Sequence, residues 1–595
     1  MNGVLIENLE HFFKRYPKER ARITAVAELE YESHFRLEEH NGESQLIEDN
    51  TLIDSTLQGF FPPLTPGASP ARLLFINGFG LGCLFEQTLK KPFPETEEYI
   101  VIEPSVPRFL FALQQTRLDQ LFAHPKIHWI IGLKESDLAR EFFVLLSDRD
   151  RLQKANAYQM RNHPVIEALH PGYFNHVKST FEMALDICKK SHGFLSDSLE
   201  GLRNTIGNLD WLQKTPGIHL LKNKFKNIPA IIISTGPSLK KSLPILKELQ
   251  HRALLLSADA SLKILIQNEI HPHFVFCLER DEGSKPFFVD IPREKAKANL
   301  VVFPLVPSTV IQAYPGPHFA VYRQYGYYRF FEDQAEKGML QCGPSVAHMA
   351  LAFADYAGCD RAFLVGQDLA YDPENFSSHP PGISYEEWSH ASSEKDLQKK
   401  LEAAGDQLLW APGNLREKVP TSGYYEAFRL NFGEVRDRLS LNLINCTEGG
   451  AKIPGIEWKP FAEATRNFQP LPNFFEQISA LKKGYQGSEK IKLEIIDQSI
   501  QLAQTKLDQI FQNMGTKPTL IEISTLREEQ KKLQRDPVFM ALTGVFSGRR
   551  LIELEWEWNS LFEGDTNSIS KQVEILSAWH KEISLVLQSV QKTLR

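Results

Sequence analysis

The stretch Pro229-Ala-Ile-Ile-Ile-Ser-Thr-Gly-Pro-Ser-Leu239 decides how the middle of the chain folds. Its isoleucine run is typical of a strand that is buried on both faces, as in a parallel sheet. The strand must end at Gly236-Pro237, because glycine frees the backbone and proline removes an N–H group. We expect a helix to begin near Ser242, with Pro244 in its first turn. Such a turn can present backbone N–H groups to an anion, or it can simply connect a strand to a helix.

Similar strands with polar ends follow along the chain. They are predicted at residues 253–259, 274–281, 361–365 and 443–450. Ligands of parallel sheets bind outside the carboxyl ends of the strands. We therefore expect Asp259, Glu279, Arg280 and Asp281 to gather near the turn at Gly236. The alternative is that each acidic residue only caps a helix.

Three further segments add polar groups to this region. Residues 342–357 are typical of an alanine-rich helix, whose N-terminus at Gly343 and Ser345 offers a second anion site. Residues 372–412 are predicted to form a long loop that contains His379, and loops of this length are often functional. Thr421 and Ser422 are predicted to cap a later helix.

A nucleotide-binding pattern also precedes the central region. A predicted strand at 72–77 enters a turn that contains Gly78, Gly80 and Gly82, and Glu103 closes the next predicted strand. This is the layout of a Rossmann βαβ unit, in which the acidic residue meets a ribose hydroxyl. A purely structural Rossmann unit would show the same spacing, and the turn carries no catalytic group.

The chain is predicted to be an α/β protein of several units, because 595 residues are too many for one core. We expect a Rossmann-like N-terminal domain at 1–165, a helical connector at 166–225, a central parallel α/β domain at 226–456 and an α-helical C-terminal domain at 457–595. In the last of these, Leu493, Ile496 and Ile500 begin a run of apolar residues at helical spacing.

Composition argues against several classes of protein. The net charge is −7, so no general basic field favours nucleic acid as a partner. The 6 cysteines are scattered without metal-binding spacing, which predicts free thiols in a reducing compartment. The first ten residues lack the pattern of a signal peptide, and no apolar run has the length of a membrane span. We expect a cytoplasmic protein.

The central region resembles the motility-associated factor (Maf) glycosyltransferases, which modify flagellin. The match rests on Ser234-Thr-Gly-Pro-Ser-Leu239, Gly343-x-Ser-Val346, Gly366-Gln-Asp-Leu-Ala-Tyr371, Pro412-Gly-Asn414, Val419-x-Thr-Ser422 and Asn445-x-Thr-Glu-Gly-Gly-Ala451. These motifs lie between residues 200 and 456, and the flanking regions fit the family's layout more loosely. The resemblance implies a glycosyltransferase that acts on Ser or Thr of flagellin and is needed for flagellum assembly and motility.

The same core is similar to the bacterial sialyltransferases that use a CMP-activated donor. Their Gly-Pro-Ser-Leu turn falls on Gly236 to Leu239, and their Gly-x-Asp strand end falls on Gly366 to Asp368. Two of their asparagines fall near Asp259 and Glu279. This likeness implies a sialyltransferase-like central domain whose donor is a CMP-linked nonulosonic acid of the pseudaminic or legionaminic type, with no metal and no other cofactor.

The candidate site residues follow from these likenesses and from the polar ends of the strands. His379, Asp368 and Glu279 are candidate catalytic residues, because the acceptor hydroxyl needs a base within hydrogen-bond reach. The candidates for binding the CMP-sugar are Ser234, Thr235, Gly236, Pro237, Ser238, Asp259, Arg280, Gly343, Ser345, Gln367, Thr421, Ser422, Thr447, Glu448 and Gly449. The chain departs from the sialyltransferases at Val419-Pro420, where they have their base histidine, and near Ala370 and His379, where they have phosphate-binding tyrosines.

Two other functions compete with this hypothesis. The Maf core is also similar to archaeal pterin pyrophosphokinases, which would imply ATP and magnesium, with Asp259 and Asp281 as candidate metal ligands. The missing base histidine is also compatible with a flagellin-binding accessory protein that has no catalytic activity.

Overall fold

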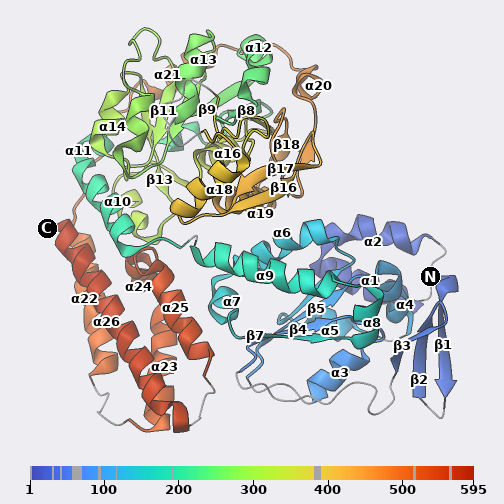
Figure 1. Cartoon of the computed structure of the whole chain (residues 1–595). Coiled ribbons are helices and arrows are strands. Elements are labelled where there is room, and N and C mark those ends of the chain that lie inside the picture. Colours follow the sequence, from blue (N-terminus) through green and yellow to red (C-terminus); the bar gives the residue numbers. More distant parts are fainter. Residues whose placement is uncertain are drawn as a thin grey trace. The chain divides into compact units, whose positions relative to one another are not determined.

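The computed structural model describes residues 3–29, 32–40, 43–55, 70–90, 95–115, 117–190, 192–380, 390–512, 518–561 and 566–595. The chain divides into two compact units (Figure 1). Unit 1 comprises Met1–Lys189, Lys517–Ile523 and Leu551–Trp579, and unit 2 comprises Lys190–Thr516, Ser524–Arg550 and His580–Arg595. The four domain boundaries expected from the sequence remain a prediction.

Unit 1 is built on a parallel four-stranded sheet with the order β6-β5-β4-β7. The strands are β4 (Leu73–Asn77), β5 (Glu98–Glu103), β6 (Ile127–Ile131) and β7 (Tyr158–Asn162), and the longer helices are α1 (Gly3–Arg15), α4 (Val106–Gln115), α6 (Glu135–Leu146) and α9 (Tyr173–Lys190). The strand predicted at 72–77 and the strand that Glu103 closes are confirmed as β4 and β5. An antiparallel sheet of β1 (Phe35–His40), β2 (Glu43–Glu48) and β3 (Thr51–Ser55) was not predicted.

The glycine-rich turn of unit 1 is closed by the chain's own carboxylates. Glu103 is fully buried, and its Oε2 accepts hydrogen bonds from the N–H groups of Phe79 (2.9 Å) and Gly80 (3.2 Å). Its Oε1 lies 2.7 Å from the buried guanidinium of Arg108. Asp54 Oδ2 accepts the next N–H of the turn, that of Leu81, over 2.8 Å. Glu103 therefore takes the place of a phosphate instead of meeting a ribose, which favours the structural interpretation of this unit.

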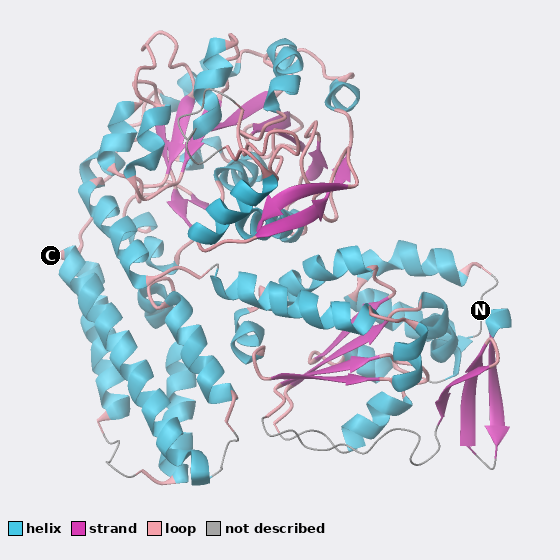
Figure 2. Cartoon of the chain, viewed as in Figure 1, coloured by secondary structure: helices cyan, strands magenta, loops and turns pink. Residues whose placement is uncertain are grey.

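Unit 2 is built on an eight-stranded parallel sheet with the order β12-β11-β10-β9-β8-β15-β18-β19. Its strands are β8 (Pro229–Ile233), β9 (Leu254–Ala258), β10 (Phe274–Cys277), β11 (Asn299–Val302), β12 (His318–Ala320), β15 (Arg361–Val365), β18 (Asn442–Asn445) and β19 (Glu457–Trp458). The predicted strand of isoleucines, β8, is next to the centre of this sheet. Figure 2 shows the helices that surround it.

Both faces of this sheet are buried, as the isoleucine run predicts. Ile231 and Ile233 belong to one apolar cluster, with Leu239 and Leu246 of α12 (Leu239–Leu249). Ile232 belongs to a second cluster, which includes most of the alanine-rich helix α16 (Val346–Ala357). Successive side chains of a strand point to opposite faces, so α12 and α16 cover opposite sides of β8.

Three details of the predicted connections are wrong. α12 begins at Leu239 and not near Ser242, with Ser238 as its N-cap residue, so that Pro244 lies inside the helix. The segment 372–412 is not all loop, because it contains α18 (Glu394–Ala403) and β16 (Leu408–Pro412), while residues 381–389 lie outside the described residues. β16 pairs with β17 (Lys418–Ser422), and Thr421 therefore belongs to a strand instead of a helix cap.

The remaining elements of the described chain are mostly helical. They include α10 (Leu195–Gly207), α11 (Leu209–Lys214), α19 (Gly423–Arg436), α20 (Phe461–Thr465), α21 (Phe474–Lys482), α22 (Glu494–Phe511), α23 (Leu520–Arg535), α24 (Pro537–Thr543), α25 (Gly548–Asn559) and α26 (Ile569–Leu594). The predicted α/β fold class with a helical C-terminal region is thereby confirmed. In the part of the chain that the structure describes, helices are too short or too polar to cross a bilayer.

Candidate active site

The candidate site lies where the strand order of the unit 2 sheet reverses. β8 and β15 are neighbours, but the strands that follow each of them extend to opposite sides. Such a point, at the carboxyl ends of the strands, is where open parallel sheets bind ligands. Here the Gly236 N–H donates to the Gly366 carbonyl over 2.7 Å, and Ser234 Oγ donates to Gln367 Oε1 over 2.6 Å. The structure thus brings together the predicted turns after β8 and β15.

Asp368 occupies the N-terminal end of α12. Its Oδ2 accepts a hydrogen bond from Ser238 Oγ over 2.7 Å, and its Oδ1 accepts one from the Ser238 N–H over 3.3 Å. Burial raises the pKa of Asp368 to about 6, against the effect of the Ser238 hydrogen bonds. A carboxylate here lies where a bound anion would lie. Asp368 and the Gly366 carbonyl therefore use the N–H groups of Ser238 and Gly236, and Pro237 has none to offer.

The turn after β18 supports Asp368 from the other side. Thr447 Oγ1 accepts a hydrogen bond from the Gln367 N–H over 3.1 Å. A β-carbon added at Gly450 would lie 2.3 Å from the Asp368 Cα, and the φ of Gly450 is +65°, so this position requires glycine. A β-carbon added at Gly449 would lie 3.1 Å from Asp368 Oδ1. The turn thus holds the Asp368 carboxylate closely in place.

His379 completes this corner of the site. Its Nδ1 lies 2.9 Å from the Thr235 carbonyl oxygen at the end of β8. A carbonyl can only accept a hydrogen bond, so Nδ1 carries the proton and Nε2 is the basic nitrogen. Burial lowers the pKa of His379, although the Thr235 hydrogen bond opposes this. The ring is therefore neutral at pH 7 and able to accept a proton.

Three other predicted binding residues support the backbone around this corner. Glu448 Oε1 accepts the first N–H of α20 over 2.9 Å. Thr421 Oγ1 donates to the Leu369 carbonyl over 2.8 Å. Ser422 is the N-cap of α19, as predicted, and its Oγ accepts an N–H of the first turn over 3.3 Å. The Thr421 contact holds the residue after Asp368, and the other two hold the starts of α20 and α19.

A second polar group at the same edge of the sheet is centred on Glu279, which follows β10. Solvent reaches its side chain. Even so, the protein around it removes part of its hydration, and this desolvation, together with the carboxylates of Asp259 and Asp281, raises the pKa of Glu279 to about 7. Arg280 and Arg323 act in the opposite direction. Glu279 is therefore a carboxyl group that changes its charge near neutral pH.

The two acids near Glu279 have local structural partners. Asp259 is buried, and its Oδ2 accepts a hydrogen bond from Ser284 Oγ over 3.0 Å. Burial raises the pKa of Asp259 to about 6. Asp281 Oδ1 accepts the Gly283 N–H over 2.8 Å, which is the capping role that the alternative interpretation assigned to it. Among the described residues, no three His, Cys, Asp or Glu side chains are grouped so as to hold a metal ion.

A second arginine whose charge acts on Glu279, Arg323, was missed by sequence reasoning. Arg280 is engaged by Asp197 of α10 (3.0 Å) and by the Tyr325 hydroxyl (3.2 Å). Arg323, in the two-residue strand β13 (Tyr322–Arg323), donates to the Gly343 carbonyl over 3.2 Å. Its positive charge thus acts on Glu279 while its guanidinium holds the turn before α16. No motif marks Arg323, because a strand this short carries no periodic signal.

The N-terminus of α16 is open, in contrast to that of α12. Ser345 is its N-cap residue, but its Oγ lies 2.7 Å from His348 Nδ1 and makes no capping bond. His348 is buried and stacked on Phe432 at 3.8 Å, and burial lowers its pKa to about 3, so its ring is neutral. The first-turn N–H groups of this twelve-residue helix and Arg323 therefore form the better anion site of the two predicted ones.

The chain is similar to a protein family over part of its length and to a solved structure over nearly all of it. The chain matches no curated protein sequence. Residues 203–374, less than half of the chain, match the family model of the 6-hydroxymethylpterin diphosphokinase MptE-like proteins. The solved MAf glycosyltransferase from Magnetospirillum magneticum AMB-1 is similar over 99% of this chain and 96% of its own, with 15% sequence identity and a TM-score of 0.54. The chain therefore shares the overall fold of that protein.

Proposed function

We propose that the chain is a glycosyltransferase that moves a nonulosonic acid of the pseudaminic or legionaminic type from a CMP-activated donor to Ser or Thr of flagellin. One observation carries the proposal. A neutral histidine bonded to the end of β8 and a titrating carboxyl group after β10 lie at one edge of the eight-stranded sheet. The positive charge of Arg323, which contacts the turn before the open N-terminus of α16, acts on that carboxyl group. The fold shared with a solved MAf glycosyltransferase supports it.

The donor's phosphate is placed at the N-terminus of α16. Arg323 and the first-turn N–H groups stabilise the negative charge that develops on CMP as it leaves. β8 and β10 are separated by one strand, so the end of β8, which His379 contacts, and the end of β10, which Glu279 follows, are about 10 Å apart. That distance leaves room for a sugar between the phosphate and the base.

His379 acts as the general base for the acceptor. The acceptor oxygen forms its bond to the anomeric carbon while the bond from that carbon to the phosphate oxygen breaks. The hydroxyl proton passes to His379 Nε2, and CMP leaves with the bonding electrons. Thr235 orients the ring, and Asp368 holds the turn in which Thr235 lies, so that Asp368 positions the base without touching the substrate.

The MptE-like match favours a second candidate, a pyrophosphokinase that uses ATP and magnesium. In this alternative Asp259 and Asp281 bind the metal ion, and their present contacts to Ser284 and Gly283 would have to open. The two candidates therefore differ in the nucleotide that they bind.

Nucleotide binding and flagellin modification test the proposal together. We expect CMP to raise the melting temperature of the protein without magnesium, because a ligand of the folded state stabilises it. We also expect co-expressed flagellin to gain the mass of the sugar when the donor pathway is present. Stabilisation by ATP only with magnesium would support the pyrophosphokinase, and flagellin binding without nucleotide binding would support an accessory protein.

The affinity for CMP is expected to fall as the pH rises from 6 to 8. Since the pKa of Glu279 is about 7, its carboxyl group is neutral at pH 6 and ionised at pH 8, where it repels the phosphate beside Arg323. The effect should be about fivefold in the dissociation constant. Protonation of CMP itself affects its binding to the wild type and to Glu279→Gln equally. Calorimetric measurement of CMP binding to both proteins at each pH therefore isolates the effect of Glu279. Identical pH profiles for the two proteins would contradict the assignment.

A further inference from the structure

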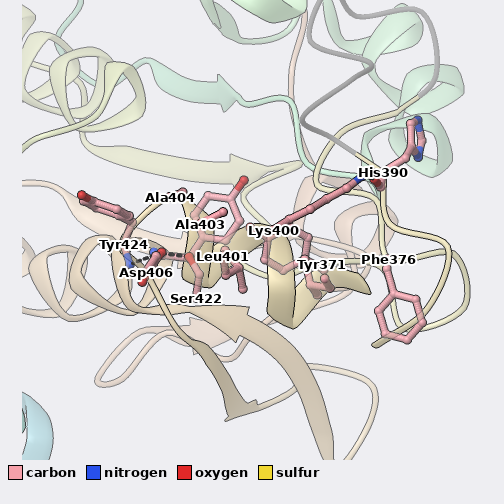
Figure 3. Close-up of a pocket in the computed structure, with 12 residues that line it drawn as sticks. Tyr371, Phe376, His390, Lys400, Leu401, Ala403, Ala404, Asp406, Ser422 and Tyr424 are labelled. Atoms are coloured by element: carbon pink, nitrogen blue, oxygen red, sulfur yellow. Dashed lines mark hydrogen bonds between the residues drawn. The ribbon is translucent and has the colours of Figure 1, made fainter. Parts of the chain in front are cut away.

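A pocket of about 490 Å³ lies among residues that follow Asp368 in the chain. Figure 3 shows the side chains that line it. Its wall is formed by the segment after Asp368, by α18 and by the start of α19. Aromatic side chains of Tyr371, Phe376 and Tyr425 line it together with Leu401 and Ala404. This volume lies in the range of sites that bind small molecules or protein side chains.

The pocket and the proposed base share one wall. Tyr425 is hydrogen-bonded to Ser378, the residue before His379. Tyr371 lies three residues after Asp368, and its ring centroid is 5.4 Å from that of Tyr425. In a displacement at the anomeric carbon, the base lies on the acceptor's side and the leaving group on the other. The pocket is therefore on the side of the site where the acceptor enters.

The charged groups of the wall are engaged by the chain. Lys400 donates to the His390 carbonyl and lies 3.8 Å from Asp396. Asp406 accepts the N–H groups of Gln407 (2.8 Å) and Tyr424 (3.3 Å). An anionic donor gains little from such a wall, whereas an uncharged side chain removes apolar surface from water. The lining thus favours an apolar occupant.

We propose that this pocket binds an apolar or aromatic side chain of the acceptor polypeptide, next to the hydroxyl that is modified. The inference rests on the proposed function, in which flagellin is the acceptor and His379 the base. It adds a recognition element that selects among the acceptor's Ser and Thr residues by their neighbours.

Filling the pocket tests this assignment. Ala404 is exposed at the C-terminal end of α18, so Ala404→Trp fills the pocket without disturbing the core. Gln398→Trp, an exposed position of α18 outside the pocket lining, is the matched control. We expect Ala404→Trp to weaken the binding of purified, unmodified flagellin at least tenfold while the dissociation constant for CMP stays unchanged. The control should change neither.

Two results would overturn the proposal. Flagellin binding by Ala404→Trp as tight as that of the wild type means that the pocket does not hold the acceptor. A selective loss of CMP binding means that it holds the nucleotide's base instead. A failure of the proposed function can be told apart from a failure of the pocket assignment. If the proposed function is wrong, the wild type itself leaves flagellin unmodified, whatever Ala404→Trp does to flagellin binding.

Discussion

Replacing His379 by glutamine is expected to lower the rate of flagellin modification by about 10²–10⁴-fold, the usual contribution of a general base. Glutamine can still donate a hydrogen bond to the Thr235 carbonyl, but it cannot take the proton of the acceptor hydroxyl. The affinity for CMP should stay within about twofold, because the phosphate is placed at α16. The measurement is the single-turnover rate of sugar transfer, followed by mass spectrometry of flagellin.

The exposed His251 provides the control for this variant. His251→Gln removes an imidazole from the same unit without touching the site, and it should transfer sugar at the wild-type rate. If His379→Gln modified flagellin as fast as the control, the base would have to be sought elsewhere, with Glu279 as the next candidate.

The second large effect is expected from Gly236→Ala. A β-carbon at Gly236 would lie 2.0 Å from Asp368 Oδ2 and 2.5 Å from the Gly366 carbonyl oxygen, so that the two turns must separate. Thr235 and the ring of His379 move with them, and a displacement of about 1 Å can lower a rate by about 100-fold. We expect transfer to fall by that factor, together with a lower melting temperature.

Gly207→Ala is the matched control, because nothing lies within 4 Å of a β-carbon at this position in α10. It should leave transfer intact and keep or raise the melting temperature, since alanine is the better helix former. A Gly236→Ala protein that resembles this control would show that the contact between the turns after β8 and β15 does not matter for activity.

The long apolar strands of the fold were predictable, whereas its short or polar ones were not. β8, β9, β10, β15 and β18 follow from apolar runs that end in polar residues. β11 begins with Asn299, and β12 is only three residues long, so neither gives a clear pattern. β1 and β2 carry acidic side chains among few apolar ones, so they lack the regular alternation that marks a strand. α18 was missed because proline and serine residues before it suggested a loop.

The candidate site, like the fold, was predictable from the sequence only in part. Sequence reasoning placed the turns at Gly236 and Asp368 correctly, because each ends a recognisable strand. It could not find Arg323 or Tyr425, whose roles arise from contacts across many residues of chain. It also assigned anion binding to the turn at Gly236, and nothing in the sequence reveals that Asp368 already occupies it.

Glu103 in unit 1 and Asp368 in unit 2 each satisfy a glycine turn with an acid from the same chain. A tethered carboxylate competes with free phosphate at an effective concentration in the millimolar range or above. Glycine spacing alone is thus a poor guide to nucleotide binding in such proteins. A better guide is whether a neighbouring strand ends in an acid that can reach the turn first.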